Sequence, residues 1–166
     1  MRLLVFLHGT TLMHPGALGR TRGERVAQVR TGSDPALQEL DAYVPVDGAV
    51  AKLRRWHEQG AGIDYLSSHR EPEEVAKDEL LLARFDFPPG RVLARGPGES
   101  YGDVAARAMP DVLIEDDCES LDGGSEITYP QIRAELRARI TSIVVPEFGG
   151  IDHLPDSLLE LVACGS

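Results

Sequence analysis

Histidine, serine and carboxylate residues follow three apolar segments of this chain, at the point where each segment ends. The three polar groups are His8-Gly9-Thr10, Ser67-Ser68-His69 and Glu115-Asp116-Asp117, after the mainly apolar segments 3–7, 63–66 and 112–114. An apolar run that stops at small or polar residues is typical of a buried parallel strand that enters a tight turn. Since open α/β sheets bind ligands at the carboxyl ends of their strands, we expect these groups to share one site.

Imidazoles and carboxylates would give such a site acid–base chemistry and a place for a divalent metal. His8 can move a proton near neutral pH, and His69 offers a second imidazole. Asp116 and Asp117 supply hard oxygen ligands, which favour magnesium or manganese over zinc. We therefore predict His8, Asp116 and His69 as catalytic residues, and Asp116 with Asp117 as metal ligands.

Other residues of the same types fall at the same expected edge. His14 and His153 also follow predicted strands, and Glu119 extends the acidic cluster. The alternative for each of them is an ordinary solvated loop residue. Cys118, beside the acidic cluster, is interpreted as a packing residue, because neighbouring carboxylates raise the pKa of a thiol and make it a poor nucleophile.

Small and hydroxyl-bearing residues at these strand ends could bind an anion. Gly9 and Thr10 offer backbone N–H groups and a hydroxyl at a turn. Ser67 and Ser68 precede a predicted helix, whose N-terminal amides attract negative charge. The alternatives are an ordinary turn and a helix cap. We predict these four residues as ligands of a phosphate group.

Apolar periodicity predicts five strands and five helices. The strands are expected at 2–7, 63–66, 91–94, 112–114 and 140–145, and the helices at 47–59, 71–84, 101–108, 130–139 and 157–163. Asp47 is the expected cap of the first helix. Strands separated by helices indicate a parallel sheet with right-handed crossovers. The fold class is therefore α/β, a three-layer Rossmann-like parallel sheet in a single domain of residues 1–166.

Residues 14–45 do not fit this alternation, because glycine and proline interrupt them. We interpret them as a small lid or insertion after the first strand, with a short strand at 23–31 and a brief helix at 34–43 capped by Asp34. The segment carries Arg20, Arg22, Arg25 and Arg30. These arginines could clamp an anion over the site or form a solvated face, and the pattern leaves both open.

Composition limits the classes of partner. The chain has 166 residues, of which 42% are hydrophobic, and a net charge of −10. An acidic chain argues against duplex nucleic acid and anionic membranes as partners. Two cysteines form no disulfide framework, and no segment reaches the roughly 20 apolar residues of a membrane span. We expect a cytoplasmic protein without a signal peptide.

Taken together, these segments resemble the haloacid dehalogenase-like superfamily of aspartyl-phosphate phosphohydrolases. Residues 6–10 match its first motif, Asp-x-Asp-Gly-Thr; residues 63–67 match its second motif, an apolar strand ending in Ser or Thr; and residues 112–117 match its fourth, a strand ending in paired acids. The resemblance implies a phosphorylated substrate, a divalent metal, a lid after the first motif and a site role for Asp116.

The chain departs from that pattern at the chemical positions. Phe6 occupies the place of the nucleophilic and metal-binding aspartate, and His8 occupies the place of the acid/base aspartate. Arg95 or Arg107 would have to serve as the third motif's phosphate-binding cation. An aspartyl-phosphate intermediate at the usual position is excluded, since a phenylalanine ring has no nucleophilic atom.

Three functions remain open on the sequence alone. In the first, a metal held by Asp116, Asp117 and histidines activates water to hydrolyse a phosphoester, with His8 as acid/base; a variant makes His8 the phosphoryl acceptor. In the second, the chain binds a small phosphorylated metabolite or nucleotide without turnover. In the third, the fold serves a protein–protein contact and no longer catalyses.

Overall fold

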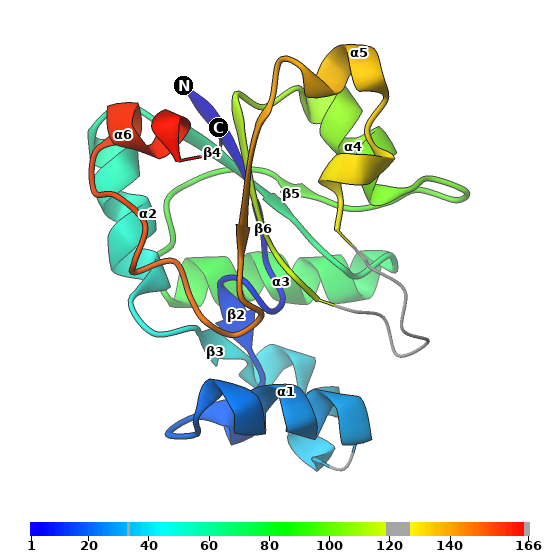
Figure 1. The fold of residues 1–166 in the computed structure, drawn as a ribbon. Helices are drawn as coiled ribbons and strands as arrows, with labels where there is room; N and C mark the ends of the chain where they lie inside the picture. Colours follow the sequence, from blue (N-terminus) through cyan, green and yellow to red (C-terminus); the bar gives the residue numbers. More distant parts are fainter. Residues whose placement is uncertain (33, 119–126, 165–166) are drawn as a thin grey trace.

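The computed structural model of the chain describes residues 1–32, 34–118 and 127–164. Its centre is a parallel sheet with the strand order β5-β4-β1-β6-β7 (Figure 1). The strands are β1 (Arg2–Phe6), β4 (Gly62–Leu66), β5 (Val92–Leu93), β6 (Val112–Asp116) and β7 (Thr141–Val145). The order reverses between β1 and β6, as in a doubly wound sheet. The prediction of a Rossmann-like parallel sheet flanked by helices is confirmed.

Strand β1 occupies the centre of the sheet because it is apolar on both faces. Leu3 and Val5 pack into one core cluster, with residues of α2 (Ala49–Glu58), α3 (Pro72–Arg84) and α6 (Leu158–Ala163). Leu4 packs into the opposite cluster, with residues of α4 (Tyr101–Ala108). A continuous apolar run is what a strand covered on both faces requires. The result is three layers, with helices on both faces of the sheet (Figure 1).

The segment between β1 and α2 forms a separate small unit near the carboxyl ends of the strands. Strand β2 (Leu12–Met13) pairs antiparallel with β3 (Val44–Pro45), and α1 (Arg22–Thr31) lies next to them (Figure 1). Short 3-10 turns occur at 15–17, 35–38 and 40–42. A third apolar cluster of Met13, Ala17, Val46 and Phe148 joins this segment to the loop after β7.

The strand predicted at 23–31 is wrong, because these residues lie within helix α1. Thr21 and Glu24 form a capping box at its start, with the Thr21 side chain accepting from the Glu24 amide. Gly32 follows the helix in the left-handed conformation, with φ of +59°. The sequence carried this signal, since Thr followed three residues later by Glu is a helix-start signature.

Several other local predictions need correction. Asp47 is not the cap of α2: Gly48 holds that position, and Asp47 adopts a φ of +44°. Residues 34–43 form two 3-10 turns, although Asp34 does accept from the Ala36 amide as predicted. The helix predicted at 130–139 shortens to α5 (Ala134–Arg137), preceded by a 3-10 turn at Tyr129–Gln131.

Within the described part of the chain, none of the helices combines the length and the apolar character that crossing a membrane requires.

Candidate functional site

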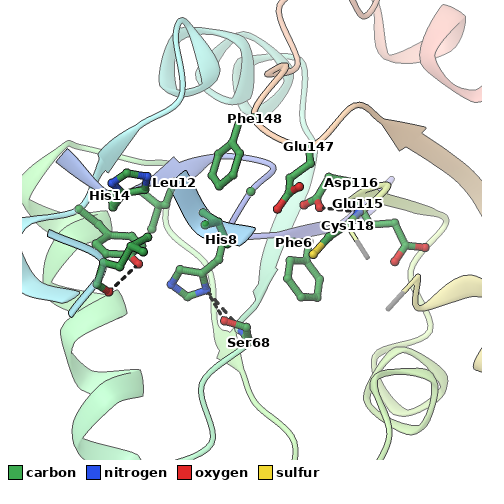
Figure 2. A pocket seen from close by; sticks show the side chains of 14 residues that line it. Phe6, His8, Leu12, His14, Ser68, Glu115, Asp116, Cys118, Glu147 and Phe148 are labelled. Atoms are coloured by element: carbon green, nitrogen blue, oxygen red, sulfur yellow. Dashed lines mark hydrogen bonds between the residues drawn. The ribbon is translucent and has the colours of Figure 1, made fainter. Parts of the chain in front are cut away.

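A cavity of about 210 Å³ lies at the carboxyl ends of β1 and β6, where the strand order reverses (Figure 2). Doubly wound sheets bind their ligands at this point. One part of the wall is apolar and includes Phe6, Leu12 and Phe148. The polar groups of the wall are His8, His14, Tyr43, Ser68, Glu115, Asp116, Cys118 and Glu147. The structure therefore brings residues from all three predicted polar groups to one cavity.

His8 stands in the tight loop that follows β1. The amide of Thr11 donates to the Leu7 carbonyl over 2.8 Å, which turns the chain back directly after His8. The Nδ1 atom of His8 lies 2.8 Å from Ser68 Oγ, and its Nε2 atom lies 3.1 Å from Asp78 Oδ1. His8 thus connects a cavity-lining hydroxyl with a carboxylate behind the cavity wall.

Asp78 determines which nitrogen of His8 carries the proton. Its side chain is only 1% exposed. Burial alone would raise its pKa, but hydrogen bonds from His69, His8 and Ser67 hold the pKa far below its ordinary value. An ionised carboxylate only accepts, so His8 donates to it through Nε2, and in the neutral ring this leaves Nδ1 as the acceptor. The Ser68 amide, 3.4 Å from Nδ1, points to the same assignment because an amide N–H can only donate.

Ser67 and His69 complete the surroundings of Asp78. The Ser67 hydroxyl donates to Asp78 Oδ2 over 2.5 Å and accepts from the His69 amide over 2.9 Å. His69 Nδ1 lies 3.1 Å from the same carboxylate oxygen, and its ring centre is 4.3 Å from that of His8. Burial would lower the pKa of His69, but Asp78 and Glu74 raise it above its ordinary value. Every polar atom of Asp78 is therefore partnered.

Asp116 ends strand β6 and lies against the turn after β1. The Thr10 hydroxyl donates to its Oδ2 atom over 2.6 Å, and the Cys118 amide donates to Oδ1 over 3.1 Å. Gly9 has a φ of +87°, and a Cβ at this position would lie 2.8 Å from Asp116 Oδ2. Glycine is required here by both backbone conformation and space. Gly9 and Thr10 thus position Asp116; their predicted contact with phosphate remains a prediction.

Asp116, Cys118 and Glu147 form a compact group of potential ligand atoms. One atom from each lies within 4.8 Å of the others. Burial, together with the charges of Glu147 and Glu115, raises the pKa of Asp116 to about 7 against the effect of the Thr10 hydrogen bond. Burial also raises the pKa of Glu147, although a hydrogen bond from the Cys118 thiol opposes it. None of the three side chains supplies a positive charge that would balance the carboxylates of Asp116 and Glu147.

A divalent cation fits this group by its donor chemistry. No lysine or arginine is among the described residues that line the cavity. Arg22 and Arg30 act on Glu147 from the neighbouring cavity, and their effect does not cancel the rise of its pKa through burial. A bound cation would favour the ionised forms of Asp116 and Glu147. The oxygens suit the magnesium or manganese expected from the sequence, and the sulfur of Cys118 adds zinc as a fitting metal. Cys118 lines the cavity, and its role as a packing residue remains a prediction.

His8, His69 and Asp78 form a second group whose potential ligand atoms lie within 4.8 Å of one another. Here the atoms that would bind a cation already hydrogen-bond to one another. The negative charge of Asp78 is also stabilised by these partners, as its lowered pKa indicates. The Asp116–Cys118–Glu147 group is therefore the better candidate for a metal.

His14 stands in the wall that the segment after β1 contributes. It is 1% exposed, and neither ring nitrogen has a hydrogen-bond partner among the described residues. The closest approach to Asp34 is 4.0 Å, from Nδ1 to Oδ2. Burial lowers the pKa of His14, so the ring is neutral, with one donor and one acceptor. A ligand that fills this end of the cavity with a polar atom would satisfy it.

Two other acidic residues of the predicted cluster accept hydrogen bonds from neighbouring protein groups. Asp117 is about half exposed, and its Oδ1 atom accepts from the Glu147 amide over 2.7 Å and from Arg22 over 3.4 Å. Glu115 accepts from the Thr128 amide over 2.5 Å, which anchors the segment after the described gap. The role of Asp117 as a metal ligand remains a prediction, and Glu119 lies outside the described residues.

Arg95 supports Ser68 from behind and does not line the cavity. Its guanidinium carbon lies 3.7 Å from the centre of the Tyr101 ring, and Nη2 is 3.4 Å from the Ser68 carbonyl oxygen. Arg107, the other candidate for the third motif, pairs with Glu99. His153 is exposed and outside the cavity wall. A phosphate contact by Arg95 therefore remains a prediction.

The arginines of the inserted segment bind protein groups. Arg20 donates to the Gly16 carbonyl. Arg25 is buried and donates to the Phe148 carbonyl over 3.0 Å and to Asp47 over 3.2 Å. Arg22 and Arg30 line a second cavity with Asp117 and Glu147. None of these arginines lines the cavity that contains His8, so the predicted anion clamp over it remains a prediction.

Sequence reasoning missed Asp78 and Glu147. Asp78 lies on the buried side of α3 with Leu81 and Leu82. A charged residue on the apolar stripe of a helix is a detectable signal, because such a residue needs a partner. Glu147 follows strand β7, so the rule that selected the other strand ends would have selected it as well.

No protein-family profile and no curated protein matches this chain.

Proposed function

We propose that the protein hydrolyses a small phosphate monoester with the help of a divalent cation and without an aspartyl-phosphate intermediate. One observation carries this proposal: a single cavity is lined by the His8–Ser68 pair and by the Asp116–Cys118–Glu147 group (Figure 2). The first can take up a proton, and the second has the donor atoms for a cation. Acid–base and metal-assisted steps are the two elements of such a hydrolysis.

The charges in the cavity favour a phosphorylated substrate only in company with a cation. The carboxyl groups of Asp116 and Glu147 would repel a phosphate dianion, and no arginine or lysine in the described wall would attract it. Asp116, Cys118 and Glu147 would hold the cation, which would neutralise the phosphate and polarise its P–O bonds. Asp117, which the sequence also predicts as a ligand, accepts hydrogen bonds from Arg22 and from the Glu147 amide and is not part of this set.

His8 would act as the general base. Its Nδ1 atom is the acceptor that faces the cavity side of the pair, while Asp78 holds Nε2. It would take the proton of the attacking group and return a proton to the leaving oxygen, so that no net protonation change remains on the enzyme. Phe6 lines the cavity at the position of the family's nucleophilic aspartate, and its ring cannot attack the phosphorus.

The family resemblance stays part of the proposal. The matched stretches end at one edge of the sheet, with Phe6 at the end of β1, Ser67 directly after β4 and Asp116 at the end of β6. The lid that the resemblance implies after the first motif would be residues 14–45. These features support a haloacid dehalogenase-like phosphohydrolase whose attacking group has been replaced.

The rest of the substrate would be small and partly apolar. A cavity of about 210 Å³ leaves little room beyond a phosphate and a short leaving group. Leu12, Leu37 and Phe148 make the end of the cavity near His14 apolar. The ring nitrogens of His14 can form hydrogen bonds with a ligand there. We expect an aromatic or short aliphatic leaving group that carries a hydrogen-bonding atom.

A second candidate function is binding of a phosphorylated metabolite or nucleotide without turnover. The unpartnered His14 favours a bound ligand, and it does not by itself require catalysis. The cavity's lack of cationic side chains in its described wall makes a cation necessary here too. The two functions differ in their dependence on His8, because only turnover requires a base.

The test is an assay of the purified protein against small phosphate monoesters, with magnesium, manganese and zinc supplied separately. We expect turnover with at least one cation, and a loss of about 10²–10⁴-fold for His8→Ala. His153→Ala is the matched control, because His153 is exposed and outside the cavity wall. Ligand-induced stabilisation without turnover would favour the binding protein; the absence of both would reject the phosphorylated substrate.

A further inference from the structure

We infer that Ser68 is the nucleophile of this site, activated by His8 and positioned with the help of Asp78. The inference rests on the proposed hydrolysis and names the attacking atom. In the first step of the reaction, the Ser68 hydroxyl attacks the phosphorus in place of a water molecule. The site would therefore act through a serine-bound intermediate.

A continuous chain of hydrogen bonds carries the inference. Ser68 Oγ lies 2.8 Å from His8 Nδ1, and His8 Nε2 lies 3.1 Å from Asp78 Oδ1. Hydroxyl, imidazole and buried carboxylate in this order are the parts of a nucleophilic triad, which is recognised by geometry and roles on unrelated folds. The imidazole is turned around relative to that of the serine proteases, because here Nδ1 faces the serine and Nε2 faces the carboxylate.

The two adjacent serines have different environments. Ser67 is fully buried, and its hydroxyl is engaged with Asp78 and the His69 amide. Ser68 lines the cavity, and its hydroxyl meets the acceptor nitrogen of His8. Only Ser68 can therefore reach a ligand, while Ser67 is a positioning residue for Asp78.

The backbone of Ser68 is held on two sides. Arg95 approaches its carbonyl oxygen to 3.4 Å, and the guanidinium stacks on the Tyr101 ring. The Ser68 amide faces His8 Nδ1 at 3.4 Å. A nucleophile needs this kind of fixed placement, because misplacement of the reacting atom costs catalytic rate.

The chemistry balances with water as the second reactant. In the first step Ser68 Oγ forms a bond to phosphorus while the ester P–O bond breaks; the hydroxyl proton passes to His8 Nδ1 and then to the leaving oxygen, which departs as an alcohol. In the second step water attacks the phosphoserine and gives a proton to His8. His8 returns that proton to Ser68 Oγ, and inorganic phosphate leaves.

A reagent that reacts with activated serines tests Ser68 without any knowledge of the substrate. The intact protein is treated with diisopropyl fluorophosphate. The Oγ atom of an activated serine attacks the phosphorus of this reagent and displaces fluoride, and the modified residue is located by peptide mass spectrometry. We expect one adduct, on Ser68, and none in Ser68→Ala. The rate of labelling should fall at least about 100-fold in His8→Ala. Ser142→Ala, on strand β7, is the matched control and should label normally.

Assays of phosphate ester turnover separate this inference from the proposed function. Turnover in the unmodified protein with a phosphoserine trapped at position 68 supports both. Turnover that survives in Ser68→Ala, or a protein that hydrolyses esters but never labels at Ser68, overturns the serine and leaves the hydrolase. Labelling at Ser68 without phosphate ester turnover keeps the nucleophile and overturns the phosphate substrate.

A second variant covers the case in which Ser68→Ala does not fold. Ser68→Cys keeps a small nucleophilic atom at the same position, so it should lose the fluorophosphate adduct and gain rapid alkylation by iodoacetamide. That alkylation should slow when His8→Ala is added, because His8 is the base for either atom. Alkylation at an unchanged rate would show that His8 does not activate this position and would overturn the inference.

Discussion

The two polar sides of the cavity differ in how their carboxylates are neutralised. Asp78 is surrounded by donors from His8, His69 and Ser67, and its pKa lies far below the ordinary value. Asp116 has carboxylate neighbours, and burial raises its pKa to about 7. The first side is complete within the protein, whereas the second gains stability from a proton or a cation. On this contrast we base our proposal of proton transfer for the first side and cation binding for the second.

One turn of the chain positions both sides. His8 reaches Ser68 and Asp78, while the next two residues, Gly9 and Thr10, pack against Asp116. The Phe148 amide donates to the Gly9 carbonyl over 2.7 Å, which links the loop after β7 to the same turn. A displacement of this turn would therefore disturb the base and the cation group together.

The largest effect is expected from Asp78→Asn on the complete side. An amide can donate to His8 Nε2, which would move the imidazole proton to Nδ1 and leave no acceptor for Ser68. Catalytic imidazoles in the wrong tautomer lose about 10⁴-fold in kcat. Steady-state turnover of the best phosphate ester measures this. Asp64→Asn is a control away from the cavity, since Asp64 pairs with Arg91; an equal loss in both variants would contradict the role of Asp78.

The cation side should respond to Asp116→Asn in two opposite ways. Without metal, the variant should be more stable than the unmodified protein above about pH 7, because a buried carboxyl with a raised pKa opposes folding when it ionises. With metal, the unmodified protein should gain about 2.7 kcal/mol at a cation concentration of about 100 times Kd, and the variant should gain little. Thermal unfolding with and without manganese or zinc measures both.

Asp117→Asn serves as the matched control for that measurement. Asp117 is half exposed and bonded to Arg22 and the Glu147 amide, so its loss should leave most of the cation response. Equal loss of the response in both variants would restore Asp117 as a ligand. An unchanged response in Asp116→Asn would remove the cation from this side of the cavity.

Acid should weaken the complete side only well below neutral pH, after Asp116 on the other side has taken up its proton. Because the folded pKa of Asp78 is depressed, its contribution to stability is present above the unfolded value near pH 4 and is lost as the pH falls below it. Hydrogen bonds to a charged group contribute about 1.5–3 kcal/mol. Urea unfolding of the unmodified protein and Asp78→Asn should differ by about this amount at neutral pH, and the difference should shrink toward about pH 2.

His69 makes the stability of the Asp78 side decrease at higher pH. Its folded pKa is raised, so its contribution is present below about 6.5 and is lost as the pH rises through the folded value. Comparison of His69→Gln with the unmodified protein across this range isolates it. A difference that grows with pH would show that His69 carries no proton for Asp78.

The sequence predicted the architecture and several site residues that follow strands, but it did not predict Asp78, which lies on a helix. Continuous apolar runs predicted the buried parallel strands, and polar residues at their ends predicted that His8, Ser68 and Asp116 meet. Asp78 was missed because it comes from a helix face, where its partners become visible only after the sheet and α3 pack. In the inserted segment the prediction placed a strand where α1 lies, and it did not place β2 or β3, because such short strands carry too little periodicity.

The smallest effect concerns His14, at the apolar end of the cavity. Its two ring nitrogens have no partner among the residues that the structure describes, which makes the folded protein less stable than an apolar side chain would, since a buried polar group without a partner costs about 1–3 kcal/mol. His14→Leu should therefore raise the free energy of unfolding by about 1 kcal/mol, because the volume match is imperfect. The same variant should weaken binding or turnover of substrates with a polar atom in the leaving group. Unfolding curves and KM measure the two effects, and a variant that is destabilised would show that His14 already has a partner in solution.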